Sequence, residues 1–255
     1  MRPEPVSAVA SEAWRLLLHP PAAHRGLWSP KGAPENSLAA FEAAVDAGYG
    51  IELDVRLSAD GEVMVFHDDG LERMVGRLGK LAQHTAAELG AMRLKDTREP
   101  VPTLRQVLDR IDGRVLILVE IKSAPGQEGP LDQKVAETIK DYAGPLAVIG
   151  FNPFSHAWWA ERHPDVLRGL NSHAYQGDAA APFSAAQLKS LRNLEHVAIA
   201  RPHFLGLGVD MLPSAAAARL RGQGYPIVAW TVRSADQWSA IEADSDNLIF
   251  EGFAP

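Results

Sequence analysis

The sequence predicts an α/β protein with the fold of a (β/α)₈ TIM barrel, carrying a β-hairpin after the second strand and a small insertion at about residues 69–100. Three observations favour this fold. The chain has 255 residues, and about 250 is the usual size of one such barrel. Short apolar runs alternate with helical patterns, and most runs are continuous, as in parallel strands covered on both faces. Once a single hairpin strand is set aside, eight strand–helix units remain.

The expected elements follow from where these runs and patterns begin and end. Asp60-Gly61 is a favoured dipeptide in hairpin turns, and too few residues separate the second and third strands for a crossover helix. The third strand should therefore run antiparallel to the second. Asn36 is expected to cap the first helix of the barrel and Gly48 to end it. The expected strands are Ala22–Arg25, Gly50–Leu57, Val63–His67, Val115–Ile121, Leu146–Phe151, Leu167–Leu170, His196–Ala200, Pro226–Val232 and Asn247–Glu251. The expected helices are Ser37–Ala47, Thr103–Arg110, Leu131–Asp141, Pro153–Arg162, Ser184–Arg192, Pro213–Arg221 and Ala235–Ala243.

Composition and charge exclude several classes of protein. The net charge is −7 and no long basic run occurs, so the sequence predicts no nucleic-acid partner. The absence of cysteine excludes disulfide scaffolds, cysteine-based zinc sites and thiol nucleophiles. No stretch approaches the roughly 18 apolar residues of a membrane span, so we expect a cytoplasmic protein without a transmembrane segment. Residues 1–255 are expected to form a single domain, and the oligomeric state is left open.

The predicted hairpin brings acidic and imidazole side chains together. Glu52 and Asp54 share one face of their strand, because side chains alternate along a strand. If Asp60 and Gly61 form a two-residue turn, His67 lies opposite Asp54 and shares its face. Two acids within an otherwise apolar strand are costly unless a partner compensates them. We therefore expect these three groups to belong to one site.

Two further strands end in charged residues at the same rim of the predicted barrel. Glu120 and Lys122 face the same way at the end of one strand, and His24-Arg25 end the first. Barrel enzymes place catalytic groups at the C-terminal ends of their strands, which favours a site over internal ion pairing. Carboxylates without thiolates suit Mg²⁺ or Ca²⁺, and two histidines suit proton transfer. Because Arg25 and Lys122 can neutralise a phosphate oxygen, these residues together predict metal-assisted cleavage of a phosphodiester.

Eight short motifs follow one another along the chain: His24-Arg25-Gly26, Pro34-Glu35-Asn36-Ser37, Glu52-Leu53-Asp54-Val55, Asp60-Gly61, His67-Asp68, Pro102-Thr103-Leu104, Glu120-Ile121-Lys122 and Trp230-Thr231-Val232. In type and order they resemble those of the glycerophosphodiester phosphodiesterases. These are barrel enzymes that release an alcohol and glycerol 3-phosphate from deacylated phospholipids. The resemblance is strongest over residues 22–122 and weaker in the second half, where Phe151-Asn152 and Trp230 carry it.

The resemblance implies a role for each residue of the predicted site. His24 and His67 would be the acid–base pair, and Arg25 and Lys122 would hold the phosphate of a small-molecule glycerophosphodiester. Trp230 would line the glycerol side. The residues that would bind the divalent metal, Mg²⁺ or Ca²⁺, are Glu52, Asp54 and Glu120. The insertion falls where the family carries its small extra domain, but the sequence does not predict what the insertion does.

Some positions depart from the family or allow a plainer interpretation. The family often has Thr-Asp-x-Pro after its last strand, whereas this chain has Phe250-Glu251-Gly252-Phe253, which puts a role for that acid in doubt. Arg233 stands where Asn is frequent. Glu35-Asn36 matches the family, and its plainest interpretation is helix capping.

Three alternative functions stay open. A related phosphodiesterase of the lysophospholipase D type would have a larger apolar mouth, to which Leu27-Trp28 and Trp158-Trp159 could contribute. A catalytically silent phosphate-binding barrel would have no need of the acid–base pair. A metal-dependent aldolase or isomerase could use the same fold. The head group, the preferred metal, and the choice between direct attack by water and a cyclic phosphate intermediate are not predicted.

Overall fold

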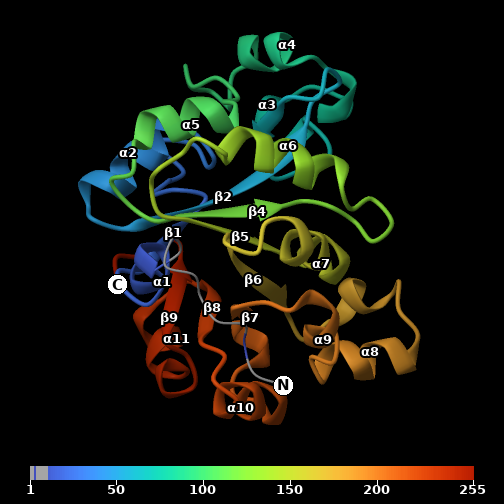
Figure 1. The fold of residues 1–255 in the computed structure, drawn as a ribbon. Coiled ribbons are helices and arrows are strands. Elements are labelled where there is room, and N and C mark those ends of the chain that lie inside the picture. Colours follow the sequence, from blue (N-terminus) through green and yellow to red (C-terminus); the bar gives the residue numbers. More distant parts are fainter. Residues whose placement is uncertain (1–2, 4–10) are drawn as a thin grey trace.

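A computed structural model describes residues 3 and 11–255. Within that part of the chain, eight parallel strands form a closed ring in which each strand is bonded to the next along the chain and β9 is bonded back to β1 (Figure 1). The predicted (β/α)₈ TIM barrel is confirmed. The strands of the ring are β1 (Ala22–His24), β2 (Gly50–Leu57), β4 (Ile117–Ile121), β5 (Leu146–Gly150), β6 (Leu167–Ser172), β7 (Phe204–Gly208), β8 (Ile227–Val232) and β9 (Asn247–Phe250).

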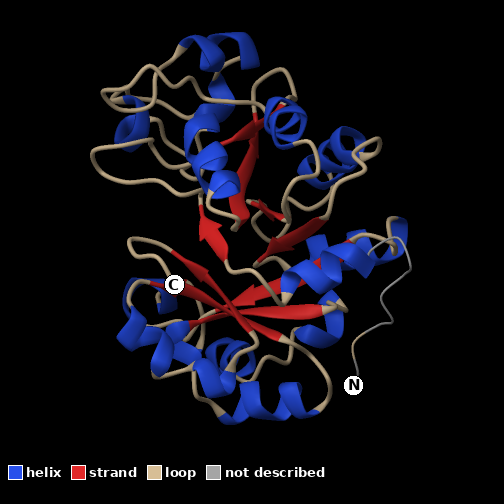
Figure 2. Ribbon diagram, turned by 90° about the vertical axis from the view of Figure 1, so that its left-hand side faces the viewer, coloured by secondary structure: helices blue, strands red, loops and turns tan. Residues whose placement is uncertain are grey.

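Helices surround the ring, as Figure 2 shows. Their apolar faces and the outward side chains of the strands form the main core, while Ala13 and Leu17 of α1 (Ser11–Leu17) join the residues that fill the barrel itself. Ser37, not Asn36, caps α2, because its side chain accepts a hydrogen bond from the Ala40 amide. The helices that follow strands of the ring are α2 (Leu38–Asp46), α5 (Leu104–Ile111), α6 (Pro130–Ile139), α7 (Pro153–Arg162), α8 (Ala185–Arg192), α9 (Val197–Ala200), α10 (Ala215–Gly222) and α11 (Ala235–Ser239). In the described residues, no helix is long and apolar enough to cross a membrane.

The hairpin has the predicted direction but not the predicted register. Strand β3 (Val63–Val65) runs antiparallel to β2 outside the ring, with Leu57 paired to Val63 rather than to Met64. The loop contains three residues instead of two, because the Ser58 amide donates to the Glu62 carbonyl. The Ser58 hydroxyl also accepts from the Glu62 amide, and these contacts lengthen the loop by one residue. The predicted pairing of Asp54 with His67 is therefore wrong, and Phe66 takes that place by donating to the Asp54 carbonyl.

One predicted strand is wrong and one real strand was missed. Residues 196–200 were expected as a strand, yet residues 197–200 form α9, which packs on α7. A run of four apolar residues has the same appearance in a short helix and in a strand, so the pattern could not separate them. The true strand, β7, contains two glycines, which weaken the strand signal. Gly206 has a physical reason to be there, because a Cβ atom at this position would lie 2.1 Å from Asn171 Oδ1 inside the barrel.

The insertion packs around a core of its own, separate from the two cores of the barrel. It contains α3 (Glu72–Val75) and α4 (Ala86–Ala91), which lie beyond β2 and β3 at the top of Figure 1. Its chain returns to the barrel at Thr103, which bridges to Met64 of β3. Three methionines, Met64, Met74 and Met92, belong to this core together with Phe66 and five aliphatic residues. The insertion is thereby anchored on the hairpin that precedes it.

Candidate active site

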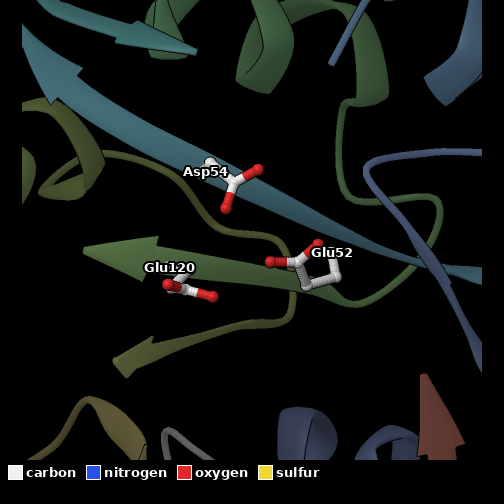
Figure 3. Close-up of side chains that lie close together, drawn as sticks. All are labelled: Glu52, Asp54 and Glu120. Carbon is white, nitrogen blue, oxygen red and sulfur yellow. The ribbon is translucent and has the colours of Figure 1, made fainter. Parts of the chain in front are cut away.

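Three buried carboxylates meet inside the barrel near the ends of two adjacent strands. Glu52 and Asp54 lie on β2 and Glu120 on β4, and the register of the two strands places Asp54 directly beside Glu120. One oxygen from each of the three lies within 4.8 Å of the others. Figure 3 shows the side chains facing a common space. The predicted acids therefore come together, because alternation puts Glu52 and Asp54 on one face of β2 and the register then brings in Glu120.

Two cations and one amide compensate this negative charge in part. Lys122 Nζ lies 2.8 Å from Asp54 Oδ1 and also contacts Glu120. Arg25 Nε lies 3.3 Å from Asp54 Oδ2, and its backbone amide donates to Glu52 at 3.0 Å. Asn36 donates its side-chain amide to the Asp54 carboxylate at 2.8 Å. Asn36 is thus a hydrogen-bond donor to the site and not the predicted helix cap.

The acids divide into one that is stabilised as an anion and one that is not. Burial alone would raise the pKa of Asp54, but the charges of Lys122 and Arg25 outweigh it and lower this pKa. Burial and repulsion by Asp54 and Glu120 raise the pKa of Glu52 well above its usual value. Glu52 Oε1 is also buried without a hydrogen-bond partner among the described residues. A hard divalent cation would satisfy that oxygen and offset the repulsion, so the donor set fits such an ion.

The first histidine of the site is held by an acid at the opposite end of the chain. His24 ends β1, and its Nδ1 lies 2.6 Å from Glu251 Oε2, just beyond β9. Its Nε2 faces the carboxylates, 3.9 Å from Glu52. Arg233 in turn lies 2.7 Å from the other oxygen of Glu251. The hydrogen bond from His24 lowers the pKa of Glu251 to about 2, so this acid remains a carboxylate.

The second histidine is held in the same manner by its neighbour in sequence. His67 Nδ1 lies 2.7 Å from Asp68 Oδ1, and Asp68 Oδ2 lies 2.6 Å from Arg73 in α3. Burial lowers the pKa of His67, and the nearby positive charges of Lys122 and Arg25 add to this effect, while Asp54 opposes it. His67 therefore lies within electrostatic range of the acids although the hairpin register differs from the predicted one.

Aromatic side chains line one side of the rim. The ring of Trp230, on β8, lies 5.4 Å from that of Phe151 and 6.3 Å from that of His173, each in an edge-to-face arrangement. The indole N–H of Trp230 has no hydrogen-bond partner in the described part of the chain. Between this wall and the acids lies Asn171, whose side-chain amide is 3.5 Å from Glu120. All eight residues predicted for the site thus lie at one end of the barrel.

Sequence reasoning missed the residues that support this site. Glu251 was in doubt because it replaces the family's usual motif, and Arg73 lies in an insertion with no recognisable pattern. Glu35 was interpreted as a capping residue, yet it accepts a hydrogen bond from Arg25 at 2.8 Å and two from Arg73 at 2.7 Å. The available signals were the acid directly after His67 and the acid at the end of the last strand.

A closed barrel with acids, histidines and cations at one rim defines a barrel enzyme, and comparison with known proteins identifies its kind. The model of the glycerophosphoryl diester phosphodiesterase family matches residues 24–250. The chain is 29% identical over 238 residues to a glycerophosphodiester phosphodiesterase of Caldanaerobacter subterraneus subsp. tengcongensis, covering 89% of this chain and 91% of that protein. It is 33% identical over 247 residues to glycerophosphodiester phosphodiesterase 1 of Bos taurus, covering 87% and 74%.

Solved structures agree with these relatives. A phosphodiesterase of Oleispira antarctica, in complex with its product sn-glycerol-3-phosphate, superposes with a TM-score of 0.78 at 25% identity over 94% of each chain. A glycerophosphodiester phosphodiesterase of Thermotoga maritima gives a TM-score of 0.70 at 27% identity, over 91% of this chain and 94% of the other. This chain belongs to the glycerophosphoryl diester phosphodiesterase family, and the prediction made from its motifs is confirmed.

Proposed function

We propose that this enzyme hydrolyses small glycerophosphodiesters to an alcohol and glycerol 3-phosphate, with a divalent metal and with His24 and His67 as acid and base. The observation that carries the proposal is the cluster of three carboxylates, in which Asp54 contacts Lys122 and Glu52 lies 3.9 Å from His24. The relative of known structure holds sn-glycerol-3-phosphate, which is the product this reaction would give. A binding protein would have no use for two histidines oriented by carboxylates.

Mg²⁺ or Ca²⁺ would be held by Glu52, Asp54 and Glu120, and when bound it supplies positive charge to the phosphate oxygens. Arg25 and Lys122 border the same space and would bind the non-bridging oxygens. They would stabilise the negative charge that these oxygens carry in the transition state as the ester bond breaks. Trp230, across the rim, would cover the carbon atoms of the glycerol.

The two imidazoles would move the protons. Each has its Nδ1 engaged by a carboxylate, so its Nε2 is the atom left to face the substrate. A carboxylate on one ring nitrogen fixes the tautomer and the orientation of the other. One histidine would accept the proton of the attacking hydroxyl or water, and the other would donate a proton to the leaving alcohol. The position of His24 on β1 and of His67 beyond β3 puts them on separate elements, which suits opposite ends of one reaction.

The test is an assay of the purified protein on glycerophosphocholine, glycerophosphoethanolamine, glycerophosphoglycerol and a lysophospholipid, each with Mg²⁺, Ca²⁺ or EDTA. We expect release of glycerol 3-phosphate from at least one glycerophosphodiester with a metal and none in EDTA, because three converging carboxylates repel one another without a cation.

Glu52→Gln should lose activity and bind the metal more weakly, while Glu62→Gln, at an exposed position beside the hairpin loop, serves as the matched control and should keep both. Full turnover in EDTA would contradict the metal assignment. Turnover of the lysophospholipid alone would favour the alternative substrate class.

A further inference from the structure

Arg73, in the insertion, hydrogen-bonds to two acids of the site, Glu35 and Asp68. It lies in α3, between Leu71 and Met74, which are both buried in the core of the insertion. The Met74 carbonyl also accepts a hydrogen bond from the Lys95 amide, so the short helix is fixed on two sides. The Arg73 guanidinium is left pointing toward the barrel with 44% of its side chain exposed.

One end of this guanidinium leads to the phosphate-binding side. Two of its nitrogens donate to the two oxygens of Glu35 at 2.7 Å each, an arrangement that fixes the plane of the carboxylate. Glu35 is buried, and the oxygen that faces Arg73 Nη2 also accepts from Arg25 Nη1 at 2.8 Å. Arg25 then reaches Asp54 at 3.3 Å. Arg73 therefore determines where Glu35 can hold the Arg25 head group.

The other end leads to the proton-transfer side. Arg73 Nε donates to Asp68 Oδ2 at 2.6 Å, and Asp68 Oδ1 lies 2.7 Å from His67 Nδ1. Burial alone would raise the pKa of Asp68, but the hydrogen bonds from Arg73 and His67 outweigh it and lower this pKa. The same guanidinium thus fixes the orientation of the acid that orients His67.

We propose that Arg73 is a positioning residue that couples the phosphate-binding arginine to the proton-transferring histidine through Glu35 and Asp68. The proposal rests on the proposed function, since it gives Arg25 and His67 the roles assigned above. It also gives the insertion a purpose, because its helix α3 supplies the side chain that hydrogen-bonds to both Glu35 and Asp68.

A purely structural ion pair would behave differently. Glu35 is buried, so a purely structural role predicts that removing Arg73 lowers stability and leaves the kinetics of the folded enzyme unchanged. A coupling role predicts losses in both kcat and KM, each of which can be traced to one of the two acids. Glu35→Gln should chiefly raise KM through Arg25, Asp68→Asn should chiefly lower kcat through His67, and Arg73→Ala should do both.

The kinetic test uses Arg73→Ala and Arg73→Lys, with Arg77→Ala as the matched control on an exposed arginine of the same insertion. We expect Arg73→Ala to lower kcat/KM about 10- to 100-fold, the range found when groups that orient site residues are removed. Arg73→Lys should recover only a small part, because an ammonium cannot span both carboxylates as the guanidinium fork does. Arg77→Ala should match the wild type.

Double variants then separate coupling from independent damage. Because Arg73 acts on kcat through Asp68, the Arg73→Ala/Asp68→Asn double variant should lower kcat no further than the worse single variant. Losses of kcat that multiply, or an Arg73→Ala variant within twofold of the wild type in both parameters, would overturn the proposal. Arg73→Lys carries the test if the alanine variant does not fold.

A measurement without substrate keeps this inference distinct from the proposed function. In ¹⁵N-histidine-labelled protein, the Nδ1 resonance of His67, assigned with His67→Gln, reports its hydrogen bond to Asp68. Arg73→Ala should shift this signal and Arg77→Ala should leave it unchanged. If the wild type hydrolysed no glycerophosphodiester, the proposed function would fail and this signal alone would decide the coupling. An unchanged signal in Arg73→Ala would refute it.

Discussion

Each of the two histidines of the site contacts an acid that is in turn paired with an arginine, but the two acid–arginine pairs come from different parts of the molecule. His24 contacts Glu251, which pairs with Arg233, and all three lie on strands of the ring or directly after them. The corresponding partners of His67 are Asp68 and Arg73, supplied by the segment that leads into the insertion and by α3. In each case an acid lies within 2.7 Å of the ring Nδ1.

The difference lies beyond the arginines. Arg233 is 57% exposed, and among the described residues its hydrogen-bond partners besides Glu251 are the Thr231 carbonyl, at 3.4 Å, and the Gln237 side chain, which accepts from its backbone amide. Arg73 continues to Glu35 and so to Arg25. The support of His24 is therefore local, whereas the support of His67 is connected through Glu35 to Arg25, the proposed phosphate-binding residue. Orienting an imidazole needs an acid alone, whereas linking it to substrate binding needs a residue with two acidic partners.

The largest expected effect comes from removing either histidine. General acid–base catalysis contributes about 10²–10⁴-fold to a rate, whereas losing a neutral hydrogen bond costs about 0.5–1.5 kcal/mol, roughly tenfold. His24→Ala and His67→Ala should each lower kcat by at least about 10²-fold with a smaller change in KM, measured by steady-state kinetics on the best substrate. If one variant kept near-normal kcat, that histidine would not act in proton transfer and the two histidines would not be equivalent.

A smaller effect should follow from changing the acid and the arginine behind His24. Glu251→Gln removes the charge that fixes the ring and should lower kcat about 10- to 100-fold. Arg233→Ala removes an exposed ion pair and should lower it less than about fivefold, the equivalent of about 1 kcal/mol. Arg73→Ala should exceed Arg233→Ala in kcat/KM. Equal losses from the two arginines would show that the additional connection through Glu35 has no consequence.

The third effect concerns stability and a histidine with a different environment. His156 is fully buried in α7, where its ring bonds the Gly150 carbonyl, and burial lowers its pKa to about 4. In the unfolded chain the pKa is about 6.5, so below that pH the unfolded state binds more protons and stability falls as the pH falls.

Between pH 7.5 and pH 5 this group should account for about 2 kcal/mol of lost unfolding free energy. Urea unfolding of the wild type and of His156→Gln at both pH values measures it, since the variant should lack this part of the loss. An identical pH dependence in the two proteins would contradict the buried neutral state. Turnover at neutral pH should not change, because His156 lies outside the site.

The clustering of the three acids could be predicted because it depends on short-range rules. Alternation along β2 puts Glu52 and Asp54 on one face, and a parallel neighbour of the same register brings Glu120 beside them. The hairpin was less predictable, since the Ser58 hydroxyl contributes to a three-residue loop and no pattern of apolar residues reports such a contact. His67 still lies within electrostatic range of Asp54, two residues beyond the end of β3.

The support of the site could not be predicted because it joins residues far apart in the sequence. Glu35 and Arg73 are 38 positions apart, and their contact depends on how the insertion packs on the hairpin. The strand β7 was not predicted because its two glycines weaken the strand signal, and a side chain at either would meet a close neighbour, Asn171 at Gly206 and Asp210 at Gly208. Local preference was overridden there by a close approach inside the ring.

The pairing of β1 with β9, which closes the barrel, also determines when during synthesis the site can form. Ala22 pairs with Ile249, and the contact between His24 and Glu251 spans 227 positions. Contacts this distant form late, because the entropy of closing the intervening chain must be overcome first. In a chain made from its N-terminus, β1 is synthesised first among the strands and the acid that orients its histidine comes after the last of them. A chain that ends before residue 247 therefore lacks both β9, the partner of β1, and Glu251, the acid that contacts His24.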